Sequence, residues 1–202
     1  MDIPASPSER EILAAFKMPR LVTITGRSST ITNSFVQAII PVVQPSVTQI
    51  VEVLSLLGMT PSSVECVYCG DASTEWDHLN SLVSRKRPTG FWSTIRNLVP
   101  SCGKCNQSRG GSHWKAWMTG SAHWSPSTRK IPDLAQRIER LERFEKWADC
   151  RSYDFESLIG VELWEEYRLA AEEVAGSIAH AQSVAERVKV KLAEALESSG
   201  AI

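Results

Sequence analysis

Four of the five cysteines of this 202-residue chain form two pairs with identical spacing. A Cys-x-x-Cys turn places two thiolates on one side of a tight backbone turn, and two such turns supply the four sulfur ligands of a closed tetrahedral zinc site. Redox chemistry would need only one of the pairs, and disulfides would need an oxidising compartment. The spacing therefore predicts a structural Zn²⁺ ion held by Cys66, Cys69, Cys102 and Cys105. Cys150 lies outside both pairs and is expected to be a small buried apolar residue.

A histidine, a carboxylate and a carboxamide that could serve metal-assisted chemistry lie between the cysteine pairs and directly after them. Asp77 and His78 are adjacent, and Asn106 follows the last cysteine of the second pair. Imidazole titrates near neutral pH, so His78 can act as a general base that activates water. The carboxylate of Asp77 and the side-chain carbonyl of Asn106 are hard oxygen ligands suited to Mg²⁺ or Mn²⁺. Two protein ligands would leave positions on the cation for water and phosphate.

The order Asp77-His78 sets a condition on the backbone. Neighbouring side chains on a regular strand point to opposite faces, so these two cannot share one site there. A bend or a bulge is therefore expected at this point of the chain.

In this order, the residues resemble the motifs of the HNH nuclease family, in the subtype stapled by a four-cysteine zinc site. The resemblance covers roughly residues 64–118. It rests on the Asp77-His78 pair, the segment Asn97-Leu98-Val99-Pro100, and the Cys-x-x-Cys-Asn that ends at Asn106 and leads to Arg109-Gly110. It implies a ββα-metal core in which His78 is the general base and Asp77 and Asn106 bind the catalytic Mg²⁺ or Mn²⁺. Asn97 would brace the loop and orient His78. The family often has histidine where this chain has Asn106, and asparagine there still offers the metal a ligand.

The resemblance implies a metal-dependent DNA endonuclease, restriction-type or phage-encoded, that leaves 5′-phosphate ends. Taken singly, the residues allow plainer roles: an Asp-His dipeptide is usually surface sequence, Asn97 can be a turn residue, and Asn106 can cap a helix. Two other functions therefore stay open, a non-catalytic zinc-stabilised nucleic-acid-binding module and an interaction scaffold.

The net charge of −1 hides a strong segregation along the chain. Residues 78–132 carry +9 with no acid, whereas residues 1–77 carry −4 and residues 133–202 carry −6. A basic patch of this kind can pair with acidic helices of the same chain, or it can bind the phosphates of a nucleic acid. On the second interpretation the DNA-binding residues are Arg85, Lys86, Arg87, Arg96, Lys104 and Arg109, with Arg109 near the scissile phosphate. Trp114, Trp117 and Trp124 are spaced as core residues.

The surrounding segments are expected to be helical, giving an α+β, mostly helical fold with a central ββα-metal core. Helices are predicted over residues 6–18, 46–57 and from about 133, and residues 21–34 are expected to form a loop or a short strand. The predicted regions are a helical part (1–60), the nuclease core (61–125) and a helical part (126–202).

The last predicted helix carries apolar and alanine residues at a period of 3.5 from Trp164 to Ala195. This seam can pack on its own domain or pair with a second copy of the chain as a homodimer. The N-terminus lacks a secretory signal and no apolar run is long enough for a membrane helix, so a cytoplasmic protein without membrane contact is expected.

Overall fold

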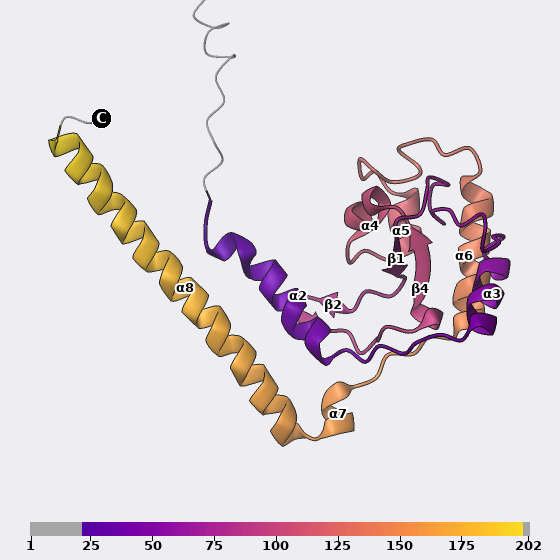
Figure 1. Cartoon of the computed structure of the whole chain (residues 1–202), viewed down its shortest axis with the longest axis horizontal. Helices are drawn as coiled ribbons and strands as arrows, with labels where there is room; N and C mark the ends of the chain where they lie inside the picture. Colours follow the sequence, from indigo (N-terminus) through magenta and orange to yellow (C-terminus); the bar gives the residue numbers. More distant parts are fainter. Residues whose placement is uncertain (1–21, 200–202) are drawn as a thin grey trace, which may run out of the picture. The chain divides into compact units, whose positions relative to one another are not determined.

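The computed structural model describes residues 22–199, and its contacts divide the chain into two compact units. One unit is Ser29–Val174. The other is formed by the two ends of the chain, of which residues 22–28 and 175–199 are described. The fold is α+β and mostly helical, as predicted (Figure 1). Its elements are η1 (Thr25–Arg27), α2 (Ser28–Ile39), α3 (Val47–Leu56), β1 (Glu75–His78), β2 (Val83–Ser84), β3 (Arg87–Pro88), η2 (Ile95–Asn97), β4 (Leu98–Ser101), α4 (Gly103–Arg109), α5 (Trp114–Thr119), α6 (Leu134–Ala148), α7 (Phe155–Ile159) and α8 (Val161–Ser198).

Two antiparallel strands and the helix that follows them form the centre of the unit Ser29–Val174. β1 pairs with β4, with Asp77 opposite Val99 and His78 opposite Leu98. The chain then passes Cys102 and enters α4, which ends before Gly110, a glycine with a φ of +52°. The first cysteine turn joins the same sheet, because the Val67 N–H donates to the Pro100 carbonyl of β4 at 3.0 Å. Both cysteine turns are thus fixed to the β1–β4–α4 unit.

Helices α3 and α6 cover this centre, and local signals explain where they begin. Ser46 caps α3 in a reciprocal capping box with Gln49, and Gly58 follows the helix with a φ of +73°. α6 begins after Asp133 and buries Leu141 and Phe144 on one face. Both predicted helices are confirmed. The shared core draws on all three predicted regions of the chain, and its fully buried members include Val53, Leu57, Tyr68, Val99, Trp114, Met118, Leu141 and Phe144.

Two sequence expectations for other segments have different outcomes. The helix predicted over residues 6–18 lies outside the described residues. The expectation of a loop or strand over residues 21–34 was wrong, because η1 and α2 occupy most of it. α2 is stabilised by tertiary packing, since Val36 and Ile40 bury against Leu82 in a second small core.

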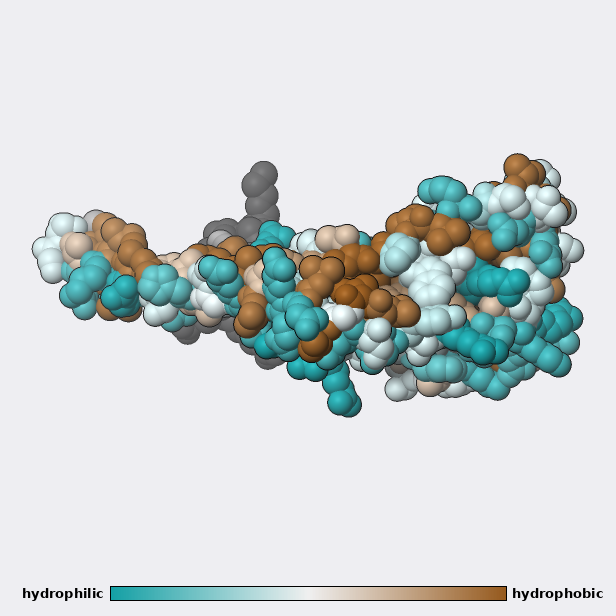
Figure 2. Space-filling view, turned by 90° about the horizontal axis from the view of Figure 1, so that it is seen from below, coloured by the Kyte–Doolittle hydropathy of each residue, from teal (hydrophilic) through white to brown (hydrophobic). Residues whose placement is uncertain are grey.

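The long helix α8 is confirmed as well, and none of its residues is buried. Apolar side chains such as Val188 and Leu192 are more than half exposed on it. Figure 2 shows apolar residues interspersed with hydrophilic ones along the part of the chain drawn at the left. In the described part of the chain, no helix combines the length and apolar character needed to cross a bilayer.

Candidate functional site: a four-cysteine cluster beside a buried aspartate–arginine pair

The four paired cysteines lie together, as the spacing predicts. Their sulfur atoms are all within 4.8 Å of one another, and all four residues are buried. The Sγ atoms of Cys69 and Cys102 are 3.8 Å apart. A tetrahedral zinc site with Zn–S bonds of about 2.3 Å has sulfur–sulfur edges of about 3.8 Å, so this spacing fits one ion. No disulfide joins any of the five cysteines.

Close packing of the thiols shifts their acidities in opposite directions. Hydrogen bonds from Cys105 and then Cys66 lower the pKa of the Cys69 thiol. The pKa of the Cys105 thiol is raised, because it lies beside Cys66 and Cys69 and is partly desolvated. Without a metal ion, the sulfur atoms of such a cluster share protons through these hydrogen bonds. A divalent cation would replace these protons, which is why binding at such a site depends on pH.

Two arginines that the sequence did not single out support the cluster. Arg129 donates from Nη1 to Cys105 Sγ at 3.6 Å and from Nη2 to Asp71 Oδ2 at 3.0 Å. Its positive charge offsets part of the −2 charge that a zinc ion with four thiolates carries. Arg137, from α6, donates to the carbonyl oxygens of Cys66 and Val67 and so fixes the first cysteine turn.

Gly70 makes room for this second arginine. It has a φ of +81°, and a Cβ there would lie 2.6 Å from Arg137 Nη2. The positive φ of this turn favours glycine, and a Cβ would also force the Arg137 guanidinium to shift.

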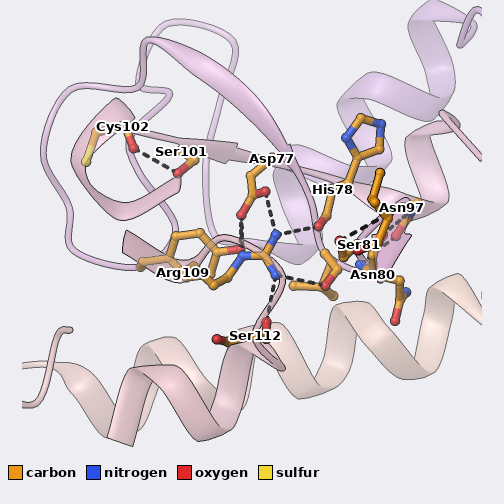
Figure 3. A network of polar contacts seen from close by, with 12 residues as sticks. Asp77, His78, Asn80, Ser81, Asn97, Ser101, Cys102, Arg109 and Ser112 are labelled. Atoms are coloured by element: carbon orange, nitrogen blue, oxygen red, sulfur yellow. Dashed lines mark hydrogen bonds and ion pairs between the residues drawn. The ribbon is translucent and has the colours of Figure 1, made fainter. Parts of the chain in front are cut away.

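Asp77 is buried, and its carboxylate accepts hydrogen bonds from other side chains, the Arg109 guanidinium among them (Figure 3). Arg109 of α4 donates from Nε to Asp77 Oδ2 at 2.7 Å and from Nη2 to Oδ1 at 2.6 Å. The Tyr68 hydroxyl donates to Oδ2 at 2.7 Å. The Asp77 and Arg109 side chains are only 4% and 2% exposed. Burial, and then the Asp77 charge, raise the pKa of Tyr68 well above its usual value, so this phenol stays a donor.

His78 points away from Asp77, which corrects the expectation of a bend or bulge. β1 pairs in regular register through its last residue, so the two side chains alternate across the strand (Figure 3). The imidazole is half-buried, and its Nε2 lies 2.8 Å from Ser93 Oγ. Burial lowers the pKa of His78 below its usual 6.5, an effect partly opposed by the charge of Asp77. The lowered pKa favours the neutral form of the ring.

Asn97 ends η2 and directly precedes β4. It is completely buried, and its Oδ1 accepts from the Asn80 N–H at 2.8 Å. Its Nδ2 donates to the carbonyl oxygens of Asn80 and Trp92. The Leu79 N–H in turn donates to the Asn97 carbonyl at 2.8 Å. Asn97 thus fixes the two residues that follow His78.

Asn106 shares a face of α4 with Arg109. The two residues are three apart on this helix, a spacing that places side chains next to each other. Since Arg109 contacts Asp77, this face of α4 is the one turned toward β1. Asn106 itself is half-buried, and its side chain makes no hydrogen bond within the described residues.

The predicted DNA-binding residues have three different environments. Arg85, Lys86 and Arg87 are exposed at the tip of the β2–β3 hairpin, and Lys104 is exposed with its Nζ 5.2 Å from the Trp124 ring. Arg96 donates to the carbonyl oxygens of Trp147 and Ala148 and lies over the Trp147 ring. Arg109 is buried against Asp77. The structure therefore leaves the hairpin tip and Lys104 open to solvent, whereas Arg96 and Arg109 also hold the fold together.

Two further expectations about packing need correction. Trp114 and Trp117 are core residues as predicted, but Trp124 is 39% exposed, because Lys104 and Arg129 contact its ring in place of apolar neighbours. Cys150 is only partly buried, because it borders a cavity.

Comparisons with protein-family models, curated proteins and solved structures gave no match to this chain.

Proposed function

We propose that this protein is a metal-dependent DNA endonuclease with an HNH-type core. The observation that carries the proposal is the β1–β4–α4 unit with a four-cysteine cluster beside it. It holds the Asp77-His78 pair on β1, Asn97 just before β4 and Asn106 on α4. The order strand, antiparallel strand, helix is the order that the resemblance implies.

His78 is the general base in this proposal. Burial favours its neutral form, and a hydrogen bond from Nε2–H to Ser93 Oγ would leave the lone pair of Nδ1 free to accept a proton from water. Asn97 fixes the backbone immediately after His78, which limits the movement of the ring.

Asp77 and Asn106 would hold the catalytic Mg²⁺ or Mn²⁺. A carboxylate has about four acceptor positions, and three on Asp77 are used by Arg109 and Tyr68, which leaves one on Oδ1. Asn106 adds a side-chain carbonyl from the facing helix. A bound cation would supply neutralisation of the charge that develops on the phosphate. Because Asp77 and His78 lie on opposite faces of β1, the proposal requires the phosphate to lie across the end of this strand, within reach of both side chains.

The exposed cations would bind the DNA backbone. The hairpin tip Arg85-Lys86-Arg87 and Lys104 carry no ion pair among the described residues. Contacts of this kind give affinity that falls steeply with salt. A homodimer through α8 would supply two active sites for a double-strand cut. We infer that the enzyme is of the restriction type or phage-encoded and acts in the cytoplasm.

A second candidate is favoured by the buried Asp77–Arg109 pair. The guanidinium already neutralises the carboxylate, so Asp77 is stable without a metal. On this interpretation the chain is a non-catalytic, zinc-stabilised nucleic-acid-binding module.

Plasmid nicking separates the two candidates. The intact chain is incubated with supercoiled plasmid and Mg²⁺ or Mn²⁺, beside His78→Ala and the control His180→Ala, which changes a histidine on the exposed helix α8. Loss of a general base should slow nicking about 10²- to 10⁴-fold, with the control at wild-type rate. Equal rates for wild type and His78→Ala would reject the enzyme. DNA binding without any metal-dependent nicking would favour the module.

A further inference from the structure

A cavity of about 340 Å³ lies on the unit Ser29–Val174, outside the proposed catalytic residues. The loop that follows the β2–β3 hairpin contributes Trp92 and Arg96, and the segment after α6 contributes Asp149, Arg151 and Tyr153. This volume is at the lower end of the range of about 300–1,000 Å³ found for small-molecule sites. It suits a single planar group rather than an extended chain.

Two aromatic rings form one wall of the cavity. The centroids of Trp92 and Tyr153 are 4.9 Å apart with their planes inclined by 40°, and Tyr153 is 45% exposed. The pair is set by the backbone, because the Tyr153 N–H donates to the Gly90 carbonyl at 3.0 Å. A Cβ at Gly90, whose φ is +86°, would lie 2.2 Å from the Tyr153 carbonyl oxygen. Only glycine permits this approach, so the position of the exposed ring is built into the fold.

The charged groups of the cavity are two guanidiniums and one carboxylate. Arg96 is anchored through Nη1 on two carbonyl oxygens of α6, which leaves its Nε and Nη2 without a partner among the described residues. Arg151 donates from Nη2 to Asp149 Oδ2 at 3.1 Å, and both of these side chains are largely exposed. The site therefore combines exposed aromatic faces with an excess of one positive charge.

A smaller cavity of about 160 Å³ adjoins this site and is lined in part by residues that follow the proposed catalytic strand. Both cavities are bordered by Arg96, Ala148, Asp149 and Cys150, and the smaller one reaches Leu79 and Asn80, which follow His78 in the chain. Glu145 and Asp149 add negative charge to the smaller cavity. A phosphate is therefore expected beside the guanidiniums of the larger cavity.

We propose that the larger cavity binds one nucleotide of the nucleic-acid strand, with its base stacked on Trp92 and Tyr153 and its phosphate paired with Arg96 and Arg151. This inference rests on the proposed function and names a substrate-binding site for it. Aromatic faces accept any base, whereas arginine donors and the Asp149 carboxylate can address its polar edge.

Binding of short single-stranded oligonucleotides tests the site without any cleavage. The full chain, without added Mg²⁺, is titrated into DNA and RNA oligonucleotides that carry one 2-aminopurine, whose fluorescence is quenched by stacking. Tyr153→Ala should weaken binding about 5- to 150-fold and remove the quenching, which is the loss of one base–aromatic stack. Tyr153→Phe should restore both. The control Tyr167→Ala removes a tyrosine that also packs on a tryptophan, Trp164 at 5.4 Å, but outside the cavity, and should bind like the wild type.

The results distinguish this proposal from the nuclease proposal. Wild-type affinity and quenching for a folded Tyr153→Ala would overturn the nucleotide site, whether or not the wild type nicks plasmid. Loss of quenching in Tyr153→Ala, with unchanged binding by His78→Ala, would support the site even if no variant cuts DNA. Equal effects on DNA and RNA would assign the site to the base and phosphate, and a preference for one would show that the sugar is read as well.

Discussion

The carboxylate of Asp77 accepts three hydrogen bonds in a place that water scarcely reaches. Burying an ion costs several kcal/mol unless a partner compensates it, and Arg109 and Tyr68 provide that compensation here. The sequence predicts a metal ligand at Asp77 and a phosphate contact at Arg109, but it does not predict the ion pair between them. They are 32 positions apart, and a basic residue near a predicted metal site is equally compatible with binding phosphate. Only the packing of α4 on β1 shows which anion Arg109 contacts.

Replacing Asn97 tests how much its buried hydrogen bonds stabilise the loop after His78. Asn97→Ala leaves one N–H and two carbonyl groups of the buried loop without partners, at a cost of about 2–4 kcal/mol in the free energy of unfolding. Asn97→Asp should lose about as much, because an oxygen would then face the two carbonyls. Urea unfolding followed by circular dichroism measures both.

Asn80→Ala is the matched control for this test. The hydrogen bonds from Asn97 reach only backbone atoms of Asn80, so this variant should keep them and lie within about 0.5 kcal/mol of the wild type. A folded Asn97→Ala of wild-type stability would contradict the bracing role.

Among the elements, those with strong local signals were predictable. The caps and apolar stripes of α3 and α6 fix where these helices begin, and the Cys-x-x-Cys spacing fixes which four sulfurs meet. The bend predicted at Asp77-His78 is missing because regular pairing with β4 continues through His78. The Ser- and Thr-rich α2 escaped detection because burial against Leu82, which lies far along the chain, outweighs its weak helix propensity.

Metal removal tests the cysteine turns as elements. The purified chain should contain one Zn²⁺, measured by inductively coupled plasma mass spectrometry, and Cys102→Ser should lose it. Apparent zinc-binding energies of about 10–16 kcal/mol in small peptides make unfolding of the unit Ser29–Val174 the expected result. Cys150→Ser, which changes the cysteine outside the cluster, should keep both metal and fold. Retention of zinc and of the melting temperature in Cys102→Ser would argue against a four-thiolate site.

The β2–β3 hairpin stores strain at its tip. Arg85 and Lys86 have φ values of +49° and +65°, a conformation that costs a residue with a Cβ roughly 1–2 kcal/mol. Asn-Gly is the preferred pair for such a two-residue turn. The double variant Arg85→Asn/Lys86→Gly should therefore raise the free energy of unfolding by about 1–2 kcal/mol. It should also weaken DNA binding and lower the slope of log affinity against log salt by about 2.

Lys130→Gly controls for the strain at this tip. Lys130 has a φ of +55° outside the hairpin, so its replacement should relieve similar strain while leaving DNA affinity nearly unchanged. Undiminished affinity in the hairpin double variant would show that the basic tip does not contact DNA.

For the molecule as a whole, α8 is the long helix whose apolar seam is not buried by any described part of the chain. Its 38 residues correspond to about 57 Å of helix, none of them buried, whereas the core is completed by α3, α4, α5 and α6. The heptad period was visible in the sequence, but its partner was not, because a seam rich in alanine is compatible with several kinds of packing. Pairing with a second copy would cover it.

A homodimer through this seam should be detectable by sedimentation equilibrium at tens of micromolar protein. Val188→Glu/Leu192→Glu places two charges on the seam and should give a monomer. Val190→Glu, which changes an equally exposed valine off the seam, should leave the dimer intact. A monomeric wild type would assign the apolar face of α8 to another role.

The fluorescence of Trp124 can report on the state of the cysteine cluster. Lys104, between two of the cysteines, lies 5.2 Å from this indole, and Arg129, which touches Cys105 Sγ, lies 5.9 Å from it. Binding of a metal ion would deprotonate the thiols and so change the charge close to Lys104 and Arg129. The electric field at the Trp124 indole would change with it. The difference in emission between the wild type and Trp124→Phe should therefore follow metal loading in real time, with no added dye.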